Sequence, residues 1–202
     1  MPQSNDPEIL AYLSQPENLP LTLEVAAYAE QARSKLLTDF RSEVKKAVED
    51  ARPAGRKAPD FACQEIGTPE DEYAGMRWIA KAAATQRENL AVTIEHYAAK
   101  DRHAIYYGLR WNSGIRPADP IYSKPEVSAL RDRLVGAAGF ETSSVWWLCW
   151  RDIHEFTSTD DFLCAYVNDR AAILTPLASA FWELVADTDG ELAKVNRLVA
   201  KR

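Results

Sequence analysis

Several features that would mark a particular class of protein are scarce in this chain of 202 residues. Its three cysteines are too widely spaced for a disulfide framework or a zinc site, and its eight glycines form no phosphate-binding loop. No apolar run is long enough to span a membrane, and no basic segment followed by an apolar stretch indicates a signal peptide. These absences predict a cytoplasmic protein in a reducing compartment, without membrane partners.

Basic residues are also outnumbered, because 24 lysines and arginines face 30 aspartates and glutamates, which gives a net charge of −6. This balance disfavours broad binding to nucleic acid, although a local basic patch would still permit it. The apolar share of 47% is typical of folded proteins, and the length suits one domain. We therefore predict an N-terminal helical arm over residues 1–20 and a single α+β domain over 21–202.

A long helix is predicted to begin near Thr22, a good N-cap residue, and to end before Pro53. Apolar residues recur there every three or four positions: Val25, Ala29, Ala32, Leu36, Phe40, Val44 and Ala47. Residues 68–82 are ambiguous. The sequence Thr68-Pro-Glu-Asp resembles a capped helix start and slightly favours a helix, whereas the residues from Gly75 onward could form a strand.

Two segments, residues 90–97 and 103–111, alternate apolar and polar side chains, as half-buried strands do. The short link over residues 98–101 predicts a hairpin. If Tyr97 pairs with Arg102, then Ile94 faces Ile105 and Val92 faces Tyr107, so the apolar faces match.

Residues 145–153 are apolar at both alternate sets of positions, which predicts a strand covered on both faces. The consecutive Trp146 and Trp147 should then point to opposite faces, so we expect that they do not line one pocket. The predicted fold is α+β. It has an antiparallel sheet of about three to four strands, a Trp-rich central strand, and long helices flanking the sheet on its faces.

The sequence shows no catalytic constellation, so we predict no enzyme and no cofactor. A Gly-x-Ser-x-Gly motif is missing, and Glu43-Val-Lys45, which has the spelling of a nuclease motif, lies in the long predicted helix. His96 and His103 would be cross-strand neighbours and could share a metal with His154 or Glu155. We favour the interpretation that the two rings only line the mouth of the hairpin, and we predict no metal site.

One region has the character of a partner surface, at the end of the second strand and in the following loop. Arginine and aromatic side chains together suit interfaces and anionic groups. The candidate partner-binding residues are Arg110, Trp111, Arg116, Tyr122 and Lys124. The alternative is that Trp111 closes the core while the charged side chains are only solvated.

The predicted elements follow a recognisable order: a long helix, a strand ending in Ile94-Glu95, the segment Ala104-Ile-Tyr-Tyr-Gly-Leu-Arg-Trp111, a Trp-rich strand and C-terminal helices. This order resembles the C-terminal part of one group of PD-(D/E)XK-superfamily proteins. The resemblance covers residues 21–202 in the order of elements. The catalytic Asp and Glu-x-Lys of that family have no counterpart here. The resemblance therefore implies an accessory module without the nuclease core, of a kind that recognises proteins or other ligands in bacteria and phages, often in defence.

We hypothesise a non-enzymatic binding protein that contacts another macromolecule, above all a protein, in bacterial or phage defence, counter-defence or toxin neutralisation. One alternative is a divergent metal-dependent nuclease or hydrolase. Another is a DNA mimic, which would space carboxylates along one face like phosphates. The sequence leaves the oligomeric state open.

Overall fold

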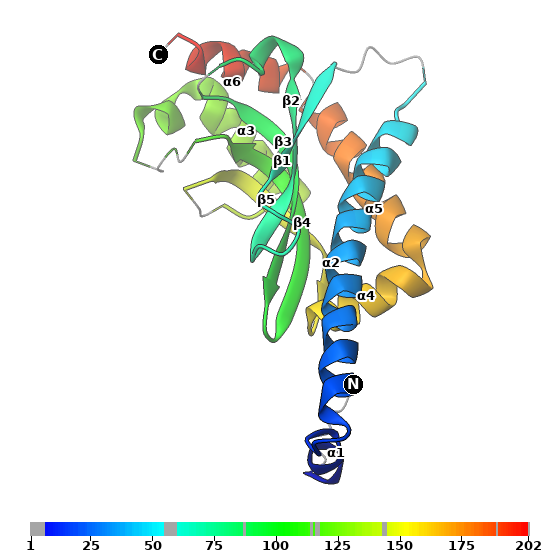
Figure 1. The fold of residues 1–202 in the computed structure, drawn as a ribbon. Helices are drawn as coiled ribbons and strands as arrows, with labels where there is room; N and C mark the ends of the chain where they lie inside the picture. Colours follow the sequence, from blue (N-terminus) through cyan, green and yellow to red (C-terminus); the bar gives the residue numbers. More distant parts are fainter. Residues whose placement is uncertain are drawn as a thin grey trace.

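The computed structural model describes residues 7–54, 60–86, 88–113, 115, 118–142, 145–188 and 190–201. It confirms the α+β class, with five strands in one antiparallel sheet (Figure 1). The strands are β1 (Phe61–Ile66), β2 (Tyr73–Ala80), β3 (Leu90–Ala99), β4 (Arg102–Trp111) and β5 (Trp147–Phe156). The α-helices are α1 (Pro7–Leu13), α2 (Leu19–Asp50), α3 (Pro125–Ala138), α4 (Thr159–Asn168), α5 (Arg170–Asp187) and α6 (Glu191–Val199). Short 3₁₀ helices are η1 (Lys81–Ala83) and η2 (Pro120–Ser123).

The sheet is a meander in which each strand pairs with the next, in the order β1-β2-β3-β4-β5. It exceeds the predicted three to four strands because residues 61–80 form a hairpin, and the slight preference for a helix over 68–82 is wrong. The backbone N–H of Thr68 does donate to a carboxylate oxygen of Asp71, at 2.7 Å, as in a cap. This contact closes a turn after Gly67, whose φ is 64°, and β2 then runs back along β1. A capping pattern therefore suits a hairpin turn as well as a helix start.

The hairpin of β3 and β4 forms as predicted, but its register is shifted by two residues. Tyr97 pairs with Ala104, and Ala99 pairs with Arg102, so that only Lys100 and Asp101 remain in the loop. Because side chains alternate with a period of two, this shift keeps every side chain on its expected face. The alternation determines which face of the sheet each side chain occupies, and several registers are compatible with it. The observed register is the one that closes the hairpin with a two-residue turn.

The Trp-rich strand β5 lies at the edge of the sheet, which corrects the prediction of a central position. It pairs with β4, and on its other side the described residues show a single isolated bridge, between Glu141 and Trp150. Complete cover on both faces is also wrong, because β5 is buried only at its start and the neighbouring Trp146 is 44% exposed. Continuous apolar character here reflects an open aromatic face, not a second covering layer.

The helices pack against one face of the sheet and form one core with it. This face carries Trp78, Ile94, Tyr107 and Trp111, which join buried side chains from α2 to α6 in a single cluster. Ring contacts link the two layers, such as Trp78 with Phe181 at 4.9 Å between centroids. The expectation of long helices on both faces is therefore wrong, since the described α-helices gather on the side that the apolar alternate residues face, and only the short η1 packs on the other, against Ile79 and Ala91.

The predicted long helix is confirmed as α2, but only its C-terminal half is packed. Leu37 is the first buried residue of α2, and α1 has none, so both extend beyond the body (Figure 1). This arm exposes a run of large apolar side chains: Ile9, Leu10, Tyr12, Leu19, Leu21, Leu23, Val25 and Tyr28. No helix in the described part of the chain is long and apolar enough to cross a membrane.

Candidate functional site

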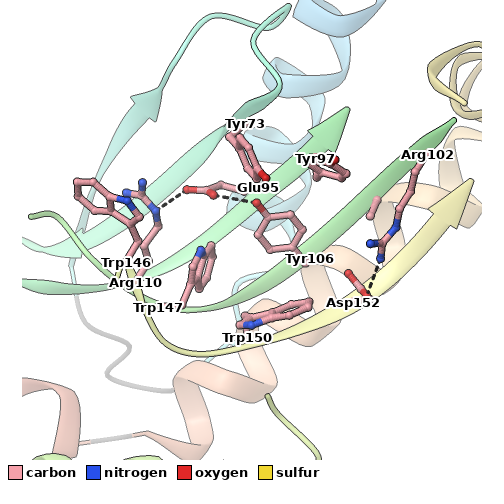
Figure 2. Close-up of a pocket in the computed structure, with 11 residues that line it drawn as sticks. Tyr73, Glu95, Tyr97, Arg102, Tyr106, Arg110, Trp146, Trp147, Trp150 and Asp152 are labelled. Carbon is pink, nitrogen blue, oxygen red and sulfur yellow. Dashed lines mark hydrogen bonds and ion pairs between the residues drawn. The ribbon is translucent and has the colours of Figure 1, made fainter. Parts of the chain in front are cut away.

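The sheet face that turns away from the α-helices carries a cavity with a volume of about 790 Å³ (Figure 2). It lies over β2, β3, β4 and β5, and its lining combines aromatic rings with two arginines and two carboxylates. The lining residues are Tyr73, Glu95, Tyr97, Arg102, Ala104, Tyr106, Arg110, Trp146, Trp147, Trp150 and Asp152. A volume of this size falls in the range of ligand-binding sites.

Three tryptophans line this cavity together, contrary to the expectation that Trp146 and Trp147 point to opposite faces. Trp146 lies before the first residue of β5, where the strand geometry does not apply. A register shift between Leu109 and Arg110 on β4 then places Trp147 and Trp150 on the same face although they are three residues apart. Because of this irregularity, β5, which was predicted to be a core strand, forms one wall of the cavity.

The aromatic rings pack edge to face around Tyr106 (Figure 2). The centroid of its ring lies 5.3 Å from that of Trp147 and 5.7 Å from that of Trp150. On the opposite wall, the rings of Tyr73 and Tyr97 lie 5.0 Å apart. These geometries are favourable for aromatic pairs and hold the rings in place without a ligand.

A buried ion pair forms one end of the cavity floor. Glu95 is 3% exposed, and its Oε1 lies 2.7 Å from Nε of Arg110 in a contact that is electrostatic and not a well-aligned hydrogen bond. The hydroxyl of Tyr106 donates to the other carboxylate oxygen at 3.1 Å. The guanidinium of Arg110 also lies 5.0 Å from the ring centroid of Trp146. Burial raises the pKa of Glu95, while Arg110 and the Tyr106 hydroxyl act in the opposite direction.

A second arginine marks the far end of the cavity, beside the β3–β4 turn. Arg102 contacts Glu155 at 2.7 Å and Asp152 at 3.5 Å. Its guanidinium lies 6.0 Å from the ring centroid of Tyr97. Both arginines of the cavity are thus neutralised by carboxylates, so the lining presents mainly ring faces.

The residues predicted to form a partner surface are not brought together on one face. Arg110 lines the cavity, whereas the next residue, Trp111, is fully buried on the helix side and donates from its indole nitrogen to the hydroxyl of Tyr122 at 3.1 Å. Tyr122 is also buried, Lys124 is exposed, and Arg116 lies outside the described residues. The alternative in which Trp111 closes the core describes that residue correctly.

His96 and His103 do lie side by side, with ring centroids 5.1 Å apart, but each has another partner. Nε2 of His96 is 3.2 Å from the carbonyl oxygen of Asp71, and the ring of His103 stacks on Phe162 at 4.2 Å. Burial lowers the pKa of His103 to about 3. Glu95 cannot join them, since adjacent residues of a strand point to opposite faces. Within the described residues no group of three or more metal-ligating side chains was found.

Sequence reasoning missed the cavity, although signals for part of it were present. Glu95 and Tyr106 sit at positions of β3 and β4 that alternate with the core residues, so their shared face could have been inferred. The contribution of β2 and β5 to the cavity could not have been inferred, because local periodicity encodes neither the hairpin of β1 and β2 nor the irregular pairing of β4 with β5. Comparisons of this chain with protein-family models, curated proteins and solved structures found no match.

Proposed function

We propose that this chain is a non-enzymatic binding protein that contacts a segment of a partner protein through the aromatic cavity on the uncovered face of its sheet. The observation that carries the proposal is the gathering of six tyrosine and tryptophan rings around one cavity, on a face that the described helices leave open. Tyrosine, tryptophan and arginine are the residues that supply most binding energy in protein interfaces.

The charged groups support a role in binding over one in catalysis. A catalytic carboxylate must reach the group from which it takes a proton. Glu95, the most buried acid of the cavity, has one oxygen held against Arg110 and the other accepting from Tyr106. This triad fixes the shape of the floor under the rings. The defence setting stays a prediction that rests on the family resemblance alone.

The proposal is tested by selecting a random peptide library on the immobilised chain, in parallel with a Trp146→Ala variant. Trp146 suits this test because its side chain is 44% exposed, so its removal should not disturb the core. We expect peptides that the original chain enriches and the variant does not. The matched control is Tyr28→Ala, which removes an aromatic ring of 60% exposure from the arm and should retain the same peptides. Equal enrichment on all three proteins, or none on any, would contradict the proposal.

A further inference from the structure

The length of the cavity indicates an extended ligand. Arg110 lines one end and Arg102 the other, and both belong to β4. Eight residues of a strand separate them, which corresponds to about 26 Å at about 3.3 Å per residue. A compact small molecule would occupy only part of this length. A polypeptide in the polyproline II conformation, with a rise of about 3.1 Å per residue, would span it with about eight residues.

The lining offers mainly ring faces, and part of its hydrogen-bonding capacity is already used. The backbone groups of β3 and β4 are used in the ladder between the strands, and the hydroxyl of Tyr106 is committed to Glu95. An ordinary peptide laid over this surface would bury N–H groups without partners, at a cost of about 1–3 kcal/mol each. Proline has no N–H group, its flat ring packs on aromatic faces, and a proline-rich chain is already extended before it binds.

The end of the cavity near the β3–β4 turn is acidic. A neighbouring hollow shares Arg102 with the cavity and is lined also by Asp101, Glu155 and Asp161. Asp152 lines the cavity itself and contacts Arg102, so this end holds four carboxylates and one guanidinium, and two of the carboxylates contact that guanidinium. The surplus of negative charge favours a lysine or arginine side chain of the ligand at this end and disfavours an acidic one.

We infer that the aromatic cavity binds a proline-rich segment of a partner protein, in the polyproline II conformation, with a lysine or arginine of that segment seated among the carboxylates beside Arg102. The inference rests on the proposed function and names its ligand. It requires both features together, namely rings along the cavity for the prolines and carboxylates at one end for the basic residue.

The first test titrates the full chain with three synthetic peptides: eight prolines alone, and the same peptide with an arginine at either end. Binding is followed by tryptophan fluorescence and calorimetry. We expect all three to bind and one arginine peptide to bind about 5- to 10-fold more tightly than eight prolines. Trp146→Ala should weaken every peptide at least 10-fold, and Tyr28→Ala should leave them unchanged.

The second test separates the two halves of the recognition with the double variant Asp101→Asn and Glu155→Gln. It should reduce the affinity of the better arginine peptide to that of eight prolines and leave eight prolines unaffected. Failure of all three peptides to bind the original chain, while library selection yields Trp146-dependent peptides poor in proline, would overturn this inference and leave the proposed function standing. Failure of both experiments would overturn both.

Discussion

The ion pair between Glu95 and Arg110 allows a prediction that depends directly on the geometry of the cavity floor. Replacing Arg110 by alanine removes the only cation in contact with Glu95 among the described residues, and leaves a carboxylate whose remaining partner is the hydroxyl of Tyr106. Removing one member of a buried pair costs about 3–5 kcal/mol. We expect a loss of about 3 kcal/mol in the free energy of unfolding at pH 7.5, because the remaining hydrogen bond compensates in part.

This loss should depend on pH, and its sign follows from the direction of the pKa shift. Burial already raises the pKa of Glu95 above its ordinary value, and losing Arg110 raises it further. At pH values between the unfolded pKa, which is about 4.3, and this raised folded pKa, the folded variant binds a proton that the unfolded chain releases, so its stability is greatest below the unfolded pKa. Stability falls as the pH rises through the folded pKa. The deficit should therefore shrink between pH 7.5 and pH 5.

The assay is urea denaturation of Arg110→Ala, Glu95→Gln and the double variant at both pH values. In the double variant the buried charge is gone, so most of the stability lost in Arg110→Ala should return. Two results would refute the reasoning: a deficit in Arg110→Ala that is the same at both pH values, or a double variant no more stable than Arg110→Ala alone.

Three further predictions concern the rest of the molecule. A Cβ atom at Gly108 would lie 2.1 Å from a carbonyl oxygen of β5, so Gly108→Ala should lower the free energy of unfolding, measured by urea denaturation, by about 3 kcal/mol. In the same assay Gly136→Ala in α3, where a Cβ meets nothing within 4 Å, should be neutral or stabilise by up to about 1 kcal/mol. The ring of His103, whose folded pKa of about 3 lies below the ordinary 6.5, should show no titration by NMR between pH 8 and pH 5. Its contribution to stability is present above about pH 6.5 and is lost as the pH falls from there. A ring that titrates near 6.5 would contradict its burial. Deleting residues 1–14 should change the free energy of unfolding by less than about 1 kcal/mol, because α1 buries no side chain, and a larger loss would show that the arm packs on the body.

The sequence by itself determined the elements whose signal is local. The alternation along β3 and β4 predicted two strands and the face of each residue, and the three-to-four spacing predicted the helix α2. It did not determine how much of α2 is packed, because Leu19 lies on the same side of the helix as buried Leu37, about five turns earlier, yet remains 41% exposed. Periodicity reports which side of a helix is apolar, and only the presence of a neighbour decides whether that side is buried.

The tertiary structure decided the features that depend on pairing between distant segments. Residues 68–72 carry a pattern that is typical of a turn as well as of a helix start. They form a turn because β2 pairs with β1 and β3. The register shift beside Arg110 placed Trp147 and Trp150 on one wall, against the strict alternation that a regular strand would impose. The cavity forms because the register shift between β4 and β5 occurs at a face of the sheet that the described α-helices leave open. Neither condition has a local signature, since each arises from contacts between residues far apart in the chain.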